Sequence, residues 1–230
     1  MSNRIKFELD GKQVEAEPGE TIWQVSKREG TRIPHLCYLD QPGYRPDGNC
    51  RACMVEVEGE RVLAASCIRT PTEGMKVKTA TDRAKTAREM VFELLLSDQP
   101  EREEAHDPDS RFWKWIDDMG VEPVSRFPKR EQPKADSTHT AIAVNLDACI
   151  HCNLCVRACR EVQVNDVIGM ASRGHGSKVV FDFDDGMGSS TCVACGECVQ
   201  ACPTGALMEA NLLDDTGKRT EFEDRTVNTL

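Results

Sequence analysis

Eight of the twelve cysteines stand in one motif that occurs twice. The two copies are Cys149-x2-Cys152-x2-Cys155-x3-Cys159 and Cys192-x2-Cys195-x2-Cys198-x3-Cys202. A [4Fe-4S] cluster is held by four thiolates, and short steps between cysteines bring consecutive sulfurs to adjacent irons. The repeat therefore predicts two [4Fe-4S] clusters in one pseudo-twofold domain.

In a motif of this spacing, the fourth cysteine ligates the cluster of the other copy. We expect two interleaved ligand sets: Cys149, Cys152, Cys155 and Cys202 for the first cluster, and Cys192, Cys195, Cys198 and Cys159 for the second. Pro203 follows Cys202 as the motif requires, whereas Arg160 takes the proline position of the first copy. A pair of zinc ribbons is the alternative, although zinc does not require three closely spaced cysteines plus one.

The remaining cysteines form a separate site with the spacing C-x12-C-x2-C-x13-C: Cys37, Cys50, Cys53 and Cys67. Four thiolates complete a [2Fe-2S] cluster. The small residues around Gly48 and Ala52 would let backbone N–H groups approach the sulfurs. The spacing differs from that of plant-type ferredoxins. On ligand count alone zinc is possible here, and the flanking fold pattern favours the iron-sulfur cluster.

Residues 1–80 have the pattern of the β-rich domain that would position this site. Residues 5–9 alternate apolar and polar side chains, and Asp10-Gly11 is a hairpin signal. Thr21 would cap a short helix that carries Ile22 and Val25 inward and stops at Gly30. A second hairpin pattern and a last strand at residues 75–77 follow. Strands crossed by one helix predict a β-grasp-like α+β domain.

Residues 81–140 read as a helix followed by a proline-rich connector. The helix over 81–96 would turn an apolar stripe inward, including Ala84, Val91 and Leu94. A short helix carrying Phe112 and Ile116 on one face would anchor the connector, which has no predicted core of its own. The dicluster domain spans 141–210, and 211–230 form a polar tail.

Composition excludes other classes of function. The net charge of -10 argues against nucleic acid as a partner. No apolar run is long enough for membrane insertion, and the N-terminus has no signal-peptide core. A cytoplasmic, reducing compartment is expected, in which clustered cysteines indicate metal ligands rather than disulfides.

The motif segments resemble one known family. Segments 33–37 (IPHLC) and 45–56 (RPDGNCRACMVE) resemble the N-terminal ferredoxin domain shared by the complex I large iron-sulfur subunit, NAD-reducing hydrogenase diaphorase subunits and NAD-dependent molybdenum or tungsten formate dehydrogenases. Segments 145–166 (NLDACIHCNLCVRACREVQVND) and 190–207 (STCVACGECVQACPTGAL) look most like the formate dehydrogenase alpha subunit. The resemblance implies a β-grasp [2Fe-2S] ferredoxin domain, a linker and a double [4Fe-4S] bacterial-ferredoxin-like domain.

The chain departs from this family in two respects. Many relatives carry a further cluster, with one His and three Cys ligands, just after the helix. Residues 97–140 contain no cysteine, so we expect that cluster to be absent and His106 to be a surface histidine. In the formate dehydrogenase alpha subunits, a large molybdopterin-binding domain follows the iron-sulfur domains. The 230 residues of this sequence do not include that domain. The catalytic domain is therefore expected on a separate chain or in a missing part.

No catalytic residue is assigned, because no glycine-rich nucleotide or phosphate motif is present. The resemblance implies an electron-transfer subunit that works between a molybdopterin-containing catalytic chain or domain and flavin/NAD-binding diaphorase subunits. The alternative within the class is the small diaphorase subunit of an NAD-reducing hydrogenase or complex I-like assembly. An iron-sulfur sensor or scaffold is the alternative from another class.

Overall fold

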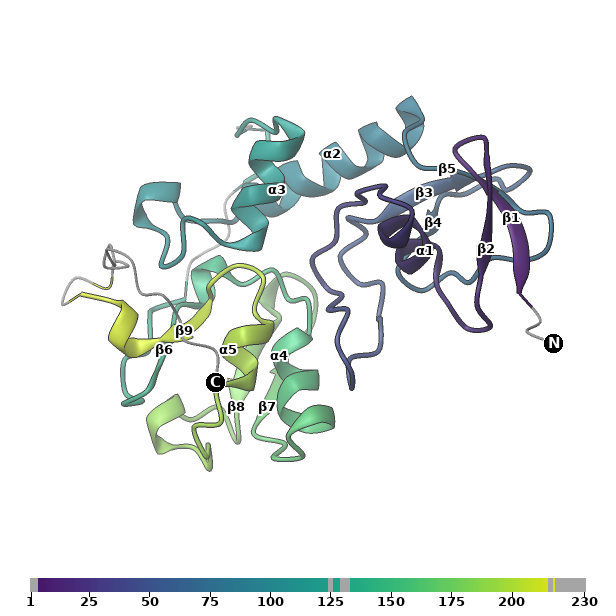
Figure 1. Cartoon of the computed structure of the whole chain (residues 1–230). Coiled ribbons are helices and arrows are strands. Elements are labelled where there is room, and N and C mark those ends of the chain that lie inside the picture. Colours follow the sequence, from purple (N-terminus) through teal and green to yellow (C-terminus); the bar gives the residue numbers. More distant parts are fainter. Residues whose placement is uncertain (1–3, 124–125, 129–132, 215–216, 218–230) are drawn as a thin grey trace.

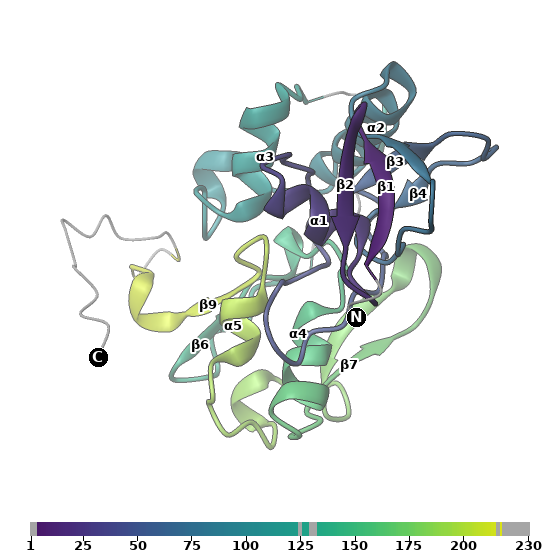
Figure 2. The ribbon, with the colours of Figure 1, turned by 45° about the vertical axis from the view of Figure 1, so that its right-hand side comes forward.

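The computed structural model describes residues 4–123, 126–128, 133–214 and 217 (Figure 1). A sheet domain, a helical connector and a dicluster lobe follow one another along the chain. Figures 1 and 2 show the connector helices lying beside both of the other parts. Most of the polar tail expected over 211–230 lies outside the described residues. Within the described part, no helix is both long and apolar enough to cross a bilayer.

The N-terminal domain is a five-stranded mixed sheet with the order β2-β1-β5-β3-β4. Its strands are β1 (Ile5–Leu9), β2 (Lys12–Ala16), β3 (Met54–Val57), β4 (Ala64–Ala65) and β5 (Lys76–Lys78). Strands β1 and β5 are parallel, and the other pairs are antiparallel. The hairpin predicted around Asp10-Gly11 joins β1 to β2, and Gly11 adopts a φ of 84°.

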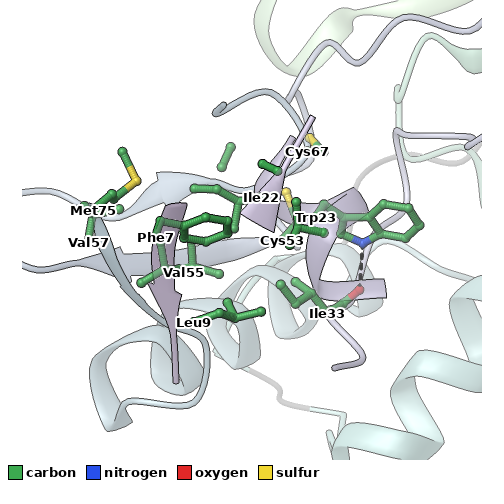
Figure 3. Close-up of a cluster of buried hydrophobic side chains, with 14 of the residues drawn as sticks. Phe7, Leu9, Ile22, Trp23, Ile33, Cys53, Val55, Val57, Cys67 and Met75 are labelled. Carbon is green, nitrogen blue, oxygen red and sulfur yellow. Dashed lines mark hydrogen bonds between the residues drawn. The ribbon is translucent and has the colours of Figure 1, made fainter. Parts of the chain in front are cut away.

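Helix α1 (Ile22–Arg28) supplies the rest of this domain's core. Thr21 caps the helix as predicted, in a capping box with Gln24, which satisfies backbone donors at the helix N-terminus. Ile22 and Val25 are fully buried. The Trp23 indole Nε1 donates a hydrogen bond of 3.1 Å to the carbonyl of Ile33 (Figure 3). This bond fixes the start of the segment that leads to Cys37.

The connector shares a core with the N-terminal domain. Helix α2 (Asp82–Leu96), the 3₁₀ turn Arg102–Glu104 and helix α3 (Arg111–Met119) form it. The rings of Phe92 and Phe112 stack with centroids 6.0 Å apart, and both pack in one cluster with Leu36 and Ala52. The apolar stripe predicted for α2 was partly wrong, because Leu94 is 48% exposed and Phe92 is buried instead.

The dicluster lobe is built from two small two-stranded sheets and two short helices. Strand β6 (Ile142–Val144) pairs with β9 (Leu207–Glu209), and β7 (Ile168–Ala171) pairs with β8 (Lys178–Phe181). Helix α4 (Leu154–Arg157) continues into a π-helical turn (Ala158–Val162), and α5 is Glu197–Ala201. Further 3₁₀ turns are Leu146–Ala148, Gly174–Gly176, Met187–Ser189 and Ala210–Leu212.

Candidate metal centres

The N-terminal cysteines lie at one edge of the first domain, on the loop before β3 and the turn after β4. Cys37, Cys53 and Cys67 are buried and Cys50 is partly buried. The backbone N–H of Cys50 approaches Cys37 Sγ at 3.4 Å, as the small residues around it predict. Hydrogen bonds from Cys50 and Cys67 lower the pKa of Cys37, and contacts with Cys37 and Cys53 raise the pKa of Cys67. The thiols therefore crowd into one space, as a four-thiolate group requires.

The first set of dicluster cysteines surrounds a single cavity. Cys149, Cys152, Cys155 and Cys202 all line it, together with apolar side chains such as Leu146, Ile150, Val179 and Leu207. Burial is the main cause that raises the pKa of the Cys155 thiol, and the neighbouring cysteines raise it further. The N–H of His151 donates to Cys149 Sγ at 3.4 Å. A thiol-lined, apolar cavity with N–H groups directed at sulfur fits a thiolate-bound cluster.

The second set also gathers at one place. Burial first, and then the charges of Cys192, Cys195 and Cys159, raise the pKa of Cys198 to about 12. The N–H of Ala194 donates to Cys192 Sγ at 3.4 Å, and that of Val167 donates to Cys159 Sγ at 3.3 Å. Cys195 is exposed, so this site reaches the surface of the lobe.

The two copies of the motif share left-handed backbone conformations at equivalent positions of their loops. His151 and Asn153 in the first copy, and Ala194 and Gly196 in the second, all have positive φ values between 53° and 76°. Left-handed residues turn successive N–H groups toward one side of a loop. In each copy the fourth cysteine lies near cysteines of the other copy. Across the described residues, no group of three or more His, Cys, Asp or Glu side chains is arranged to hold a single metal ion.

Two arginines beside these sites were missed at the level of sequence. Arg157 and Arg111 lie between the N-terminal cysteines and the first dicluster set. The one available signal was an asymmetry of the repeat, because the position of Arg157 in the first copy is Gln200 in the second. Arg111 lies outside the cysteine motifs, and no sequence pattern around it indicates its role.

The prediction that His106 is a surface residue was wrong. Its side chain is buried, and its Nδ1 has no hydrogen-bond partner within the described residues. Burial lowers the pKa of the imidazole. The preceding Ala105 is buried as well, in the core cluster that includes Phe92 and Phe112.

Two family models match the chain. A 2Fe-2S iron-sulfur cluster binding domain covers residues 2–82, and a 4Fe-4S dicluster domain covers residues 148–206. The structure resembles that of an NAD+-reducing [NiFe]-hydrogenase with a TM-score of 0.79 and 25% identity, over 94% of this chain and 92% of that chain.

Curated relatives come from three kinds of oxidoreductase. The NADP-reducing hydrogenase subunit HndD of Solidesulfovibrio fructosivorans is 35% identical over 97% of this chain. A subunit of an NADH-quinone oxidoreductase of Rhizobium meliloti is 34% identical over 89%, and a protein named as a formate dehydrogenase in Staphylococcus haemolyticus is 27% identical over 97%. The chain spans 39%, 24% and 22% of their respective lengths.

The chain is therefore an iron-sulfur protein with one [2Fe-2S] cluster and two [4Fe-4S] clusters. More particularly, it is an electron-transfer module of the kind found in NAD-linked hydrogenases, formate dehydrogenase-like proteins and complex I-like oxidoreductases.

Proposed function

We propose that this module serves an NAD-linked, formate dehydrogenase-like oxidoreductase, between a molybdopterin (Mo or W) catalytic chain or domain and flavin/NAD-binding subunits. When bound, each cluster accepts and releases one electron. The observation that carries the proposal is the adjacency of the cysteine sites: the carbonyls of Cys37 and Cys152, from different domains, accept hydrogen bonds from one guanidinium. Such adjacency suits electron transfer through the chain.

We assign the ligands as four cysteines per cluster. Cys37, Cys50, Cys53 and Cys67 would hold the [2Fe-2S] cluster; Cys149, Cys152, Cys155 and Cys202 the first [4Fe-4S] cluster; and Cys192, Cys195, Cys198 and Cys159 the second. The cavity lined by the whole of the first dicluster set supports this assignment. The N–H groups directed at Cys37, Cys149, Cys159 and Cys192 support it further.

The first domain would have the β-grasp ferredoxin arrangement. A parallel pair within the sheet, antiparallel flanking strands and one helix packed on the sheet support it. The chain would work in a cytoplasmic, reducing compartment, which free cysteines favour.

The catalytic partner would contact the lobe near the second dicluster site. Cys195 is exposed there, and the nearby Val164 and Val193 are 79% and 62% exposed. The amide of Asn165, next to Val164, approaches Cys195 Sγ at 3.9 Å. Exposed apolar side chains around a metal site are typical of a surface that another protein covers.

Two other functions are alternatives to this proposal. The hydrogenase likeness favours a diaphorase-type subunit of an NAD-reducing hydrogenase or complex I-like assembly. An iron-sulfur sensor or scaffold would need no partner oxidoreductase.

The test is to isolate the tagged chain with its bound partners anaerobically and to follow cluster reduction by visible absorbance. We expect reduction by formate and by NADH, with molybdopterin- and flavin-containing chains in the complex. Reduction by hydrogen but not formate would replace the proposal with the hydrogenase alternative. A chain that isolates alone and responds only to oxygen or iron would support the sensor.

A further inference from the structure

A buried guanidinium connects the N-terminal site to the first dicluster site. Arg157, the last residue of α4, has a side chain only 2% exposed. Its Nη2 donates to the carbonyl of Cys37 at 2.7 Å and to that of Cys152 at 3.3 Å. These two carbonyls belong to residues of two different cysteine sets, which lie more than a hundred positions apart in the sequence.

The other two nitrogen atoms of this guanidinium also have partners. Nη1 donates to the carbonyl of Arg45, and Nε lies 3.3 Å from the carbonyl of Asn153 and 3.3 Å from the Asp47 carboxylate. A planar guanidinium presents five N–H donors in a fixed geometry. Arg157 therefore holds the two loops in one relative position, and its buried charge is paired with the Asp47 carboxylate.

A second guanidinium joins the same two regions. Arg111, the first residue of α3, donates from Nη1 to the carbonyl of Tyr38 at 3.4 Å and from Nη2 to that of Ala201 at 3.2 Å. Tyr38 follows Cys37 and Ala201 precedes Cys202. Within the described residues, no carboxylate forms an ion pair with Arg111.

These positive charges lie where they can act on electron affinity. A charge in the interior is screened much less than one at the surface. Reduction adds a negative charge to a cluster, so a nearby buried cation stabilises the reduced form, and net charge and hydrogen bonding both tune cluster potentials. The second copy of the motif carries the neutral Gln200 at the equivalent position. The second copy therefore has no counterpart to the Arg157 charge at that position.

We propose that Arg157, assisted by Arg111, is a positioning and potential-setting residue that raises the reduction potentials of the [2Fe-2S] cluster and the first [4Fe-4S] cluster relative to the second. This inference rests on the ligand assignment proposed above. It deepens that assignment by naming the residues that couple two of the three sites.

The test is an EPR-monitored redox titration of the whole chain with its clusters in place. Arg157→Gln gives the first copy the side chain of the second, and Arg157→Lys keeps the charge without the planar fork. We expect the Gln variant to shift the potentials of the [2Fe-2S] and first [4Fe-4S] clusters to more negative values and to leave the second cluster unchanged. The Lys variant should retain most of the wild-type potentials.

Arg160→Gln is the matched control, because Arg160 is close in sequence but its side chain is 55% exposed and paired with Asp166. It should leave the [2Fe-2S] and first [4Fe-4S] potentials unchanged. Wild-type potentials in Arg157→Gln, or equal shifts in the Lys and Gln variants, would overturn the inference. If Arg157→Gln loses iron, Arg111→Gln decides: a negative shift of the same two clusters supports the inference and no shift refutes it. Failure of wild type to show three clusters would instead refute the ligand assignment.

Discussion

The Tyr44 phenol, on the loop between Cys37 and Cys50, donates a hydrogen bond of 2.8 Å to the Glu197 carboxylate at the start of α5. It ties the N-terminal domain to the helix that carries Cys198. Burial first, and then Glu197, raise the pKa of Tyr44. Because the folded-state pKa is raised, this contribution to stability is fully present below the ordinary value of about 10 and is lost as the pH rises through the folded-state value.

Tyr44→Phe should therefore weaken the contact between the domains. A hydrogen bond to a charged group contributes about 1.5–3 kcal/mol to stability. We expect the variant to lose only about 1 kcal/mol of unfolding free energy, because Glu197 is half-buried and keeps Gln163 as a second donor. The measurement is chemical denaturation of the cluster-loaded chain near neutral pH, together with hydrogen exchange in residues 41–50 and 197–201.

Tyr38→Phe provides the control, because Tyr38 donates at 2.9 Å to Asp40 within its own domain. It should leave exchange in α5 unchanged. Equal exchange in α5 for both variants would show that the Tyr44 bond does not join the domains.

The interleaved ligand assignment makes a pairwise prediction for cysteine variants. Cys202→Ser should alter the same EPR signal as Cys152→Ser, because both side chains line one cavity. Cys159→Ser should instead alter the signal that Cys198→Ser alters, because these thiols are neighbours. If Cys202→Ser and Cys198→Ser alter one common signal, each motif holds its own cluster and the assignment is wrong.

Gly205 tests the packing of the connector on the dicluster lobe. It has a φ of 73°, and a Cβ added there would overlap the Cβ of Asp107. Gly205→Ala should cost about 1–2 kcal/mol for the left-handed backbone and about 1–3 kcal/mol more for the overlap. Thermal unfolding of the cluster-loaded chain measures the loss.

The control is Gly120→Ala, at the C-terminus of α3. Gly120 has a φ of 63°, but within the described residues no atom beyond its chain neighbours and its own helix lies within 4 Å of an added Cβ. Only the backbone cost should appear there. Equal losses at the two positions would mean that Asp107 does not pack against Gly205.

Removal of iron should affect the two halves of the chain differently. Helices α4 and α5 have only four and five residues, which is too short for stability without tertiary support. The first domain retains a core around Phe7, Val55 and Val77, none of which is a metal ligand. After anaerobic chelation, hydrogen exchange should become fast in α4 and α5 while β1 and β5 stay protected. Uniform loss of protection in both halves would contradict this.

Turns and helix caps, which are formed by residues close together in the sequence, could be predicted from local sequence signals. Thr21 and the Asp10-Gly11 turn act over a few positions, and each is found as predicted. Side chains whose partners lie far along the chain were not predictable. Leu94 was expected inside, but Arg88 takes the buried face of α2 and donates to the carbonyls of Met54 and Thr79.

Arg157 illustrates the same limit within the candidate sites. The expected grouping of the dicluster thiols rests on local spacing, since each of these sets includes three cysteines within seven consecutive residues. The partners of Arg157 at Arg45 and Cys37 are 112 and 120 positions away, and only the fold brings them together.

We infer that the twelve cysteines hold three iron-sulfur clusters. Iron and acid-labile sulfide analysis, combined with EPR of the dithionite-reduced, anaerobically purified chain, tests it most directly. We predict about ten iron atoms per chain and three spin systems, one from a [2Fe-2S] and two from [4Fe-4S] clusters. Stoichiometric zinc with no EPR signal would contradict the account.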